Sequence, residues 1–503
     1  MGKITPSKVH EVIFASSDKA ESRRITTLLK KGEIRKIAPR IYTSNFSDEP
    51  AAIIKRNWFN ILSGLYPEAL LSHRSALEFV PTSNGHVFLT YTYTEKVQLP
   101  GLTIQFLEGP SKIEGDNVFF GSLHASQEAR AFLENLQETR RKSAEPKTLA
   151  ISQIEERLEA IIRARGENGL NALRDKAKEI SSKLGMQNEF KKLNQLISDL
   201  LPSENLRQAG LATGKSKNLT SPAAIARSLG EPLDPDRIKL FESLYEELAG
   251  KVFPQHTDQN TSVKSYKTFA FFEGYFSNYI EGTEFTVEEA KKIITTEAPI
   301  PARDEDSHDI LGTYHIVSDK KEMAICPSNA NDFLDIMRRR HAILLQSRIS
   351  KKPGEFKDKN NRAGNIEFVD KQLVAGTLKK GFEWYSLLKE PFAKAVYMMF
   401  LVSEVHPFND GNGRIARVMM NAELSAKGFS KIIIPTVYRD DYMGALRKLT
   451  RQRVADAYVR ILLCAYEFSS TLVGESIDEM EKHLIECDAL KEPKEGMLRI
   501  IKY

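Results

Sequence analysis

Two helical segments flank a glycine-rich loop at residues 391–427, and this arrangement limits the possible folds more than any other feature. Residues 391–405 (PFAKAVYMMFLVSEV) are an apolar run that begins with proline. A helix tolerates proline in its first turn, because the missing N–H has no intrahelical partner there. Residues 414–427 have an amphipathic helical pattern that ends at Gly428. The sequence therefore predicts a helical core with a loop at the N-terminus of its second helix.

The composition of this loop predicts a phosphate site. Gly411, Asn412 and Gly413 allow the backbone to adopt positive φ and to turn its N–H groups toward one point. That point also lies at the positive end of a helix dipole, so an anion is stabilised there. Arg414 and Arg417 lie one helical turn apart, and arginine holds phosphate oxygens through paired hydrogen bonds.

Three other residues of the loop complete a possible reaction site. Asp410 offers a hard oxygen ligand of the kind that Mg²⁺ on a nucleotide requires. His406 can accept a proton near neutral pH and so activate a hydroxyl group. Phe408 has no such chemistry, and we expect it to anchor the loop in the core and fix His406. Each feature alone is more often structural, but a base, a metal ligand, a glycine loop and two arginines together favour a functional site.

Residues 406–417 (HPFNDGNGRIAR) resemble the signature of the Fic family, HxFx[DE]GNGRxxR, at every specified position. The resemblance implies an all-α core that transfers a nucleoside monophosphate, usually AMP from ATP, to a Ser, Thr or Tyr hydroxyl of a target protein. Related Fic-fold kinases carry lysine at the second glycine, so Gly413 favours nucleotidyl transfer. The implied roles are base for His406, Mg²⁺ ligand for Asp410, phosphate nest for Asn412 and its two glycines, and β- and γ-phosphate binding for Arg414 and Arg417.

The resemblance covers roughly residues 240–470. Residues 353–369 look like the segment that leads into the family's flap, a small β-hairpin over the active site. Extended residues at 365–368 could then pair with the backbone of a target and place its hydroxyl. An ordinary surface hairpin is the alternative.

Residues 277–282 (SNYIEG) match the family's inhibitory pattern, [ST]xxxE[GN]. They end a predicted helix at about 266–282, on which Ser277 and Glu281 share one face. The resemblance implies that Glu281 pairs with Arg417 and stops it from holding the γ-phosphate. The alternative is a glutamate at a helix end, followed by Gly282 as the cap.

The region from about residue 5 to residue 45 shows short helices followed by a basic hairpin with a turn at Pro39, the order of a winged helix-turn-helix. Residues 5–125 loosely resemble the winged-helix antitoxin-regulators of abortive-infection systems, in the stretches 23–44 and 71–79. A local basic cluster could contact DNA phosphates without reading sequence. The alternative is a solvated face of a protein-interaction module. The cluster consists of Arg23, Arg24, Lys30, Lys31, Arg35, Lys36 and Arg40.

The whole chain is predicted to be multidomain. An all-α Fic core with a small flap follows an α+β region that contains the winged helix. The expected parts are 1–125 (winged helix-turn-helix-like), 126–201 (charged helices), 202–235 (linker), 236–476 (Fic domain) and 477–503 (helical tail).

Composition indicates an ordinary globular protein with 28% charged residues and a net charge of +5. Its three cysteines are widely spaced, which argues for a reducing compartment and against a zinc site. We find no signal peptide and no membrane-length apolar run, so we expect a cytoplasmic protein without membrane contact.

Two other functions stay open. The chain could be a DNA-binding transcriptional regulator or toxin-antitoxin-like protein in which the Fic domain senses nucleotide. The Fic domain could also remove AMP from modified proteins, with Glu281 positioning the attacking water. The sequence does not name the target protein, and it leaves homo-oligomerisation open.

Overall fold

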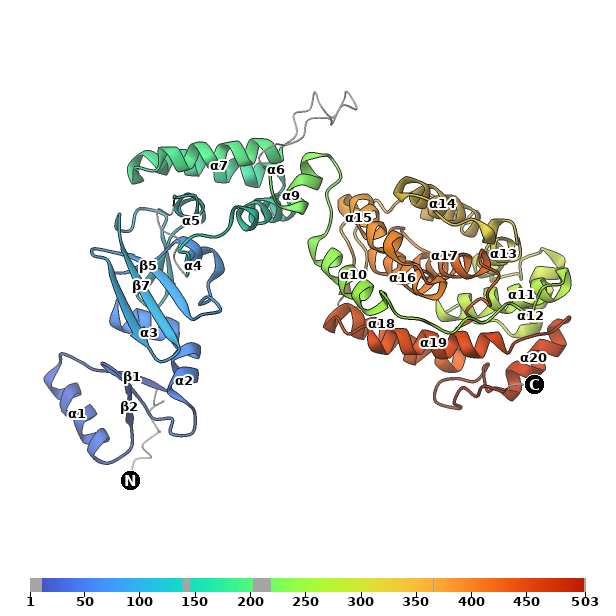
Figure 1. Cartoon of the computed structure of the whole chain (residues 1–503), viewed down its shortest axis with the longest axis horizontal. Coiled ribbons are helices and arrows are strands. Elements are labelled where there is room, and N and C mark those ends of the chain that lie inside the picture. Colours follow the sequence, from blue (N-terminus) through green and yellow to red (C-terminus); the bar gives the residue numbers. More distant parts are fainter. Residues whose placement is uncertain (1–10, 139–144, 202–218, 365, 502–503) are drawn as a thin grey trace. The chain divides into compact units, whose positions relative to one another are not determined.

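The chain divides into two compact units, which we describe separately. This computed structural model describes residues 11–138, 145–201, 219–364 and 366–501. The first unit is Met1–Gly230 and the second is Glu231–Tyr503. In Figure 1 the first unit runs from blue to green and the second from green to red. No helix among the described residues is long and apolar enough to cross a membrane.

The first unit begins with a small three-stranded sheet, in the order β1-β3-β2. Helix α1 (Lys19–Lys30) lies between β1 (Val12–Phe14) and the hairpin of β2 (Arg35–Ala38) and β3 (Ile41–Thr43). The predicted hairpin is confirmed. The expectation of helix before it is wrong at β1, because Val12 and its neighbours pair with β3 as a strand. The winged-helix resemblance stays a prediction.

A mixed six-stranded sheet follows, in the order β6-β7-β5-β4-β9-β8. Its alternating apolar residues pack against α2 and α3 in one buried cluster. The β5–β7 and β4–β9 pairs are parallel and the other pairs are antiparallel. The elements of this part are α2 (Pro50–Arg56), α3 (Trp58–Leu65), β4 (Leu70–Leu71), α4 (His73–Glu78), β5 (His86–Tyr91), β6 (Glu95–Leu99), β7 (Leu102–Glu108), β8 (Asn117–Phe120) and β9 (Leu123–Ala125).

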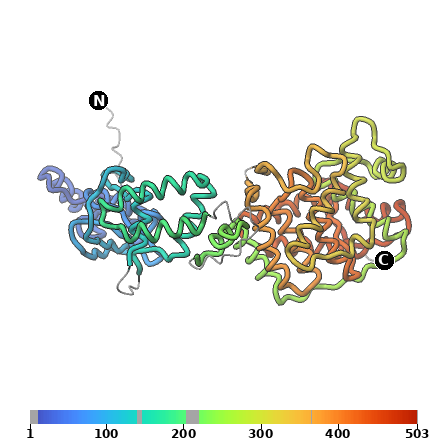
Figure 2. Tube along the Cα trace, turned by 90° about the horizontal axis from the view of Figure 1, so that it is seen from above, coloured from blue at the N-terminus to red at the C-terminus, as the bar shows by residue number. Residues whose placement is uncertain are grey.

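Charged helices complete the first unit, as predicted. Helices α5 (Glu128–Asn135), α6 (Ile151–Leu184) and α7 (Gln187–Leu200) share one apolar cluster, and α6 and α7 run side by side in Figure 2. Part of the predicted linker 202–235 lies outside the described residues. Its described part contains helix α9 (Pro222–Ser228), because Ala224 is buried against α6 and α7.

The second unit is a helical core around α16 (Pro391–Val405), which is buried along almost its whole length. Figure 1 shows α16 and α17 surrounded by the other helices of this unit. A small hairpin, β10 (Arg362–Ala363) with β11 (Ile366–Glu367), lies within the segment predicted as the flap. The other helices are α10 (Pro235–Leu248), α11 (Val263–Ile280), α12 (Val287–Thr296), α13 (Asp304–Val317), α14 (Ala330–Leu344), α15 (Val374–Leu387), α17 (Asn412–Ser425), α18 (Arg439–Gln452), α19 (Asp456–Ser470) and α20 (Ile477–Glu486).

The predicted helical tail is helical only in part. Helix α20 packs with α11 in a second apolar cluster of the same unit. The chain then leaves the helix, and the N–H of Arg499 donates to the carbonyl of Cys487 over 3.0 Å. Asp488, just after the helix, has φ 59°, a left-handed conformation that does not continue an α-helix.

Candidate active site

The loop 406–411 joins two helices that pack closely against each other, α16 and α17. His406 caps the end of α16 with a left-handed conformation, φ 54°, and Gly411 caps the start of α17 with φ 73°. Phe408 is fully buried, and its ring stacks on the imidazole of His341 at a centroid distance of 3.7 Å. The loop is therefore anchored in the core at its middle and turned sharply at both ends.

His341 fixes the loop from α14, which sequence reasoning did not foresee. Its Nδ1 accepts the N–H of Gly354 over 2.9 Å, and its Nε2 lies 3.0 Å from the carbonyl oxygen of Asp410. A carbonyl only accepts, so the proton of the neutral ring lies on Nε2. Burial lowers the pKa of His341 to about 4, and the ring stays neutral at physiological pH.

The imidazole of His406 has the tautomer that a general base requires. Its Nδ1 lies 3.3 Å from the carbonyl oxygen of Ser403, so Nδ1 donates its proton there and Nε2 keeps a free electron pair. The ring of Phe368, just beyond the β10–β11 hairpin, stacks on it at a centroid distance of 3.7 Å. Burial lowers the pKa of His406 to about 4.

The segment that leads into the hairpin is tied to the same loop. The backbone N–H of Lys357 donates to the carbonyl of Pro407 over 2.8 Å. The side-chain amide of Asn361 donates to the carbonyl of Phe408 over 2.9 Å. Asn365, the first residue of the stretch predicted to meet a target's backbone, lies outside the described residues. The segment before the hairpin is therefore linked to the loop by one backbone and one side-chain hydrogen bond.

Asn412 uses its side chain to close the loop. Its Oδ1 accepts the N–H of Phe408 over 2.8 Å, and its Nδ2 donates to the carbonyl of the same residue over 2.9 Å. Only the backbone N–H of Asn412 is left for the predicted phosphate nest. That N–H and the N–H of Gly413 belong to the first turn of α17, where a helix provides no partners for them.

The side chain of Asp410 lies at the rim of the loop, and about one-third of it is exposed. Burial disfavours its charged form. The N–H of Gly411, at 2.7 Å from Oδ1, and the cations Arg414, Lys351 and Arg348 outweigh that effect, so the pKa of Asp410 is lower than usual. The Oδ2 atom lies 3.5 Å from Lys351 Nζ and 3.9 Å from Arg348 Nη1. Asp410 is thus an ionised oxygen donor at the edge of the predicted cradle.

Carboxylates engage both predicted phosphate-binding arginines. Arg414 Nη1 lies 2.6 Å from Oδ2 of Asp309, a residue of α13 that also pairs with Arg348. Burial raises the pKa of Asp309, although both guanidiniums oppose that effect. Arg417 Nη2 lies 2.7 Å from Oε1 of Glu281.

Ser277 also holds Arg417, so all three predicted members of the inhibitory contact come together. The Nε of Arg417 donates to Ser277 Oγ over 2.9 Å, and its Nη2 donates to the carbonyl of Ser277 over 2.8 Å. Gly282 follows with φ 92°, which glycine adopts without strain. Burial alone would raise the pKa of Glu281. The charge and hydrogen bond of Arg417 outweigh that effect and lower it.

The Glu281 carboxylate lies directly above Gly413. A Cβ atom at Gly413 would lie 2.0 Å from Oε1 of Glu281 and 3.1 Å from Nη1 of Arg417. The carboxylate thus occupies the N-terminal end of α17, where the helix dipole and unpaired N–H groups favour an anion.

The sequence model of the Fic/DOC family matches residues 333–424, a segment that includes the whole loop. The chain carries a Fic domain. Among curated relatives, the protein adenylyltransferase Fic of Drosophila willistoni is 27% identical over 218 residues, which cover 41% of this chain and 42% of that protein. The Nematostella vectensis protein of the same name is 29% identical over 216 residues, with 38% and 49% covered. The chain spans less than half the length of either relative.

Solved structures that contain Fic domains show a weak overall likeness. A Fic domain containing signaling protein from Bacteroides thetaiotaomicron has a TM-score of 0.37 at 18% identity, with 49% of this chain and 97% of that chain covered. Fic-1 from C. elegans has a TM-score of 0.36 at 18% identity, with 66% and 98% covered.

The basic residues predicted to meet DNA belong to the first unit, on α1, β2 and the turns after them. Arg35 is half-buried, and its guanidinium donates to the carbonyls of Asn45 and Asp48. Arg35 therefore stabilises the small sheet and is not a free cation. The other six side chains are exposed: Arg23, Arg24, Lys30, Lys31, Lys36 and Arg40.

Proposed function

We propose that this chain transfers AMP from ATP to a hydroxyl side chain of a target protein, and that Glu281 holds it inactive. The observation that carries the proposal is the contact of Glu281 with Arg417 above Gly413, beside an imidazole with a free Nε2. The Fic domain and the names of the curated relatives support the same activity.

The residues of the loop fit the chemistry of this transfer. The hydroxyl proton moves to Nε2 of His406, and the hydroxyl oxygen forms a bond to the α-phosphorus. The bond from that phosphorus to the bridging oxygen breaks, and its electron pair leaves with pyrophosphate. Phosphate charge near His406 would raise its pKa and make the ring a stronger base.

The first turn of α17 and its two arginines would hold the phosphates. The Glu281 carboxylate now lies against Gly413 in the first turn of α17, the position that we assign to a phosphate. Arg417 would take the γ-phosphate after Glu281 leaves, and Arg414 would take the β-phosphate while Asp309 orients it. Without Arg417 the α-phosphorus would lie out of line, and a misplacement of about 1 Å costs on the order of a hundredfold in rate.

Asp410 fits a Mg²⁺ ligand through Oδ2, since Oδ1 accepts the N–H of Gly411. A Mg²⁺ ion bound there would neutralise charge on the polyphosphate. Asp410 itself would fix the phosphates relative to the loop.

The β10–β11 hairpin would bind the target. An extended segment of the target would pair with it and bring a Ser, Thr or Tyr hydroxyl to His406. Phe368, which covers the imidazole, would form one wall of the site for that side chain.

ATP carrying ³²P at either the α- or the γ-phosphate tests the reaction. We expect the Glu281→Gly protein to label itself and proteins of a lysate from α-labelled ATP but not from γ-labelled ATP. The Glu281→Gly, His406→Ala protein should give no label. Labelling from γ-labelled ATP, without labelling from α-labelled ATP, would indicate phosphoryl transfer and contradict the proposal.

Removal of AMP is the second candidate at the same site, because Glu281 could position a water. Proteins labelled by Glu281→Gly protein and then purified provide the substrate for this test. Release of labelled AMP by the wild type, and not by His406→Ala protein, would favour removal as the physiological direction.

We also propose that the six exposed cations of the first unit contact DNA. Their clustering on α1, β2 and the nearby turns supports this proposal, because phosphate contacts need exposed cations on one face. A mobility-shift assay with DNA from the protein's own promoter should show binding that weakens in Arg23→Glu, Lys30→Glu protein. Equal binding by both proteins would contradict it.

A further inference from the structure

The two edge strands of the six-stranded sheet differ in the side chains that discourage the addition of another strand. The edges are β6 and β8. Strand β6 presents exposed Glu95, Lys96 and Gln98, and charged or polar side chains discourage another strand from adding there. Strand β8 (NVFF) has no charged residue, and its Val118 is 64% exposed. Since β8 pairs only with β9 among the described strands, its outer backbone groups remain available.

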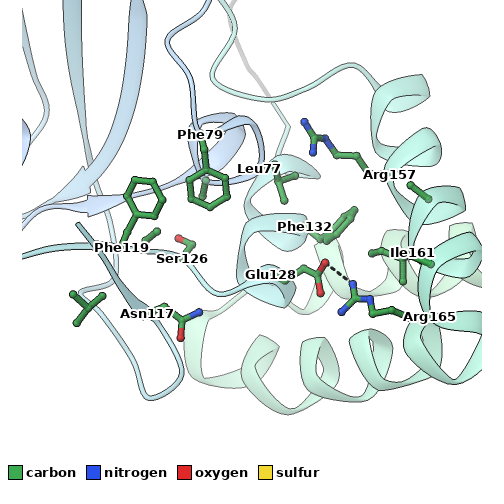
Figure 3. A pocket seen from close by; sticks show the side chains of 15 residues that line it. Leu77, Phe79, Asn117, Phe119, Ser126, Glu128, Phe132, Arg157, Ile161 and Arg165 are labelled. Atoms are coloured by element: carbon green, nitrogen blue, oxygen red, sulfur yellow. Dashed lines mark hydrogen bonds and ion pairs between the residues drawn. The ribbon is translucent and has the colours of Figure 1, made fainter. Parts of the chain in front are cut away.

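A cavity of about 520 Å³ lies beside β8, within the size range of ligand sites. The rings of Phe79 and Phe119 stack on one wall, with centroids 4.7 Å apart. Figure 3 shows this pair facing Arg157, Ile161 and Arg165 of α6 across the opening. The apolar walls suit an apolar side chain.

The α6 wall of the cavity has an uncompensated positive charge. Arg165 is paired with Glu128 at 2.6 Å, the dashed line in Figure 3. Arg157 is half-buried and has no hydrogen-bond or ion-pair partner among the residues that the structure describes. A carboxylate that reached Arg157 would supply the missing partner.

The chain around the end of β8 borders a second hollow, of about 760 Å³. Phe120 and Gly121 line it together with Leu28 of α1 and Ser63 of α3. Successive side chains of a strand point to opposite faces of a sheet. A strand added to the free edge of β8 would therefore direct alternate side chains to opposite faces of the sheet, and the neighbouring residues Phe119 and Phe120 border different hollows.

We propose that β8 binds an extended segment of a partner protein by strand addition, with an acidic side chain of that segment paired to Arg157. The four residues of β8 offer few backbone hydrogen bonds, so the two hollows supply the selectivity. A strand edge without charged residues beside the charged cavity favours a peptide over a small organic anion, which would not use the strand. The bulge between Val118 and Phe120 limits pairing to the first residues of β8. The proposal does not depend on the chemistry of the Fic domain.

Displayed random peptides of about ten residues, selected on the full chain, test this proposal. We expect enriched peptides to alternate β-branched or apolar residues with polar ones and to carry one Asp or Glu. The best peptide is then synthesised, and its Kd is measured by fluorescence anisotropy. Arg157→Glu should raise the Kd of this peptide about tenfold. A second peptide with Lys in place of the acidic residue should bind the Arg157→Glu protein as tightly as the first peptide binds the wild type.

Matched variants separate the strand from the cavity. Val118→Lys on β8 should abolish binding, whereas Gln98→Lys on the other edge and Arg163→Glu on α6 should leave Kd unchanged. A peptide with N-methylated backbone amides should fail to bind. The proposal is overturned if no peptide is enriched. It is also overturned if either Arg157→Glu or Val118→Lys leaves the Kd of the best peptide unchanged. Equal binding of the N-methylated peptide also overturns it, because the cavity would then act without strand addition.

Discussion

The Glu281 carboxylate and the Arg417 guanidinium lie 2.7 Å apart at the N-terminal end of α17. Glu281 ends one helix and Arg417 belongs to another, so the pair joins the predicted inhibitory element to the predicted phosphate cradle. The carboxylate pairs with Arg417 and lies in the space above Gly413. Under the proposed function it would block the site through both contacts.

Ser277→Ala should activate the protein partially. The change removes one hydrogen bond to Arg417 and leaves the ion pair with Glu281 intact. One net hydrogen bond is worth about 1 kcal/mol, so we expect AMP labelling to rise about fivefold. Initial rates with α-labelled ATP check this. A rate equal to that of the wild type would mean that Ser277 does not hold Arg417 in solution.

Gly413→Ala tests whether Glu281 occupies the position of a phosphate. In the wild type, the new Cβ would clash with the Glu281 carboxylate. The Glu281→Gly background removes this clash. In that background the Cβ can affect binding only if the nucleotide occupies the same space. We expect ATP affinity of the double variant to fall about tenfold below that of Glu281→Gly. Calorimetric titration measures it. Unchanged affinity would show that phosphate binds elsewhere.

The second unit should lose stability in mild acid because of His341. Its folded pKa of about 4 lies below the ordinary value of 6.5, so between these values the unfolded chain takes up the proton and the folded chain does not. The contribution of the neutral ring is complete above pH 6.5 and is lost as the pH falls toward 4. From pH 7 to pH 5 we expect His341 alone to lower the free energy of unfolding by about 2 kcal/mol, in addition to the loss from His406, whose pKa is also about 4.

Urea titrations followed by Trp384 fluorescence in a Trp58→Phe background measure this loss, since the two tryptophans lie one in each unit. His341→Gln should be less stable at pH 7 and should show a smaller decrease between pH 7 and pH 5. An unchanged pH dependence in His341→Gln protein would assign the loss to other groups.

Phe408→Ala should destabilise the Fic domain by about 3–5 kcal/mol, because it leaves a cavity beside His341 in the core. The same urea titration provides the measurement. Ile349→Ala, at a position 81% exposed, is the control and should change stability by less than about 1 kcal/mol. If the two variants were equally stable, Phe408 would not anchor the loop.

The sequence identified the loop because its motif residues lie together within residues 406–417 and the two predicted helices flank it in the structure. The chemical roles of these residues stay predictions. Between two helices, the glycines, His406 and Phe408 largely determine the local geometry. Asp309 and His341 were missed because they lie on α13 and α14, where nothing distinguishes them from other polar residues of a helix. Their roles arise only when the tertiary fold brings them to Arg414 and to the backbone of Asp410.

The first unit was harder to predict for a related reason. Strand β7 alternates buried and half-buried residues, whereas β5 is buried at four consecutive positions. Their parallel pairing, and that of β4 with β9, joins segments whose order in the sheet no local pattern specifies. β1 is only three residues long, too short for alternation to identify it. The partner of each short strand depends on burial within the whole unit.

The initial rate of AMP transfer by Glu281→Gly protein, relative to wild type at saturating ATP, tests the central claim most directly. We predict an increase of about a hundredfold, because Arg417 becomes free to align the γ-phosphate. Glu284→Gly, at an exposed position three residues further along, should behave as wild type. Equal rates for Glu281→Gly and wild type, with both proteins folded and ATP bound, would contradict the account.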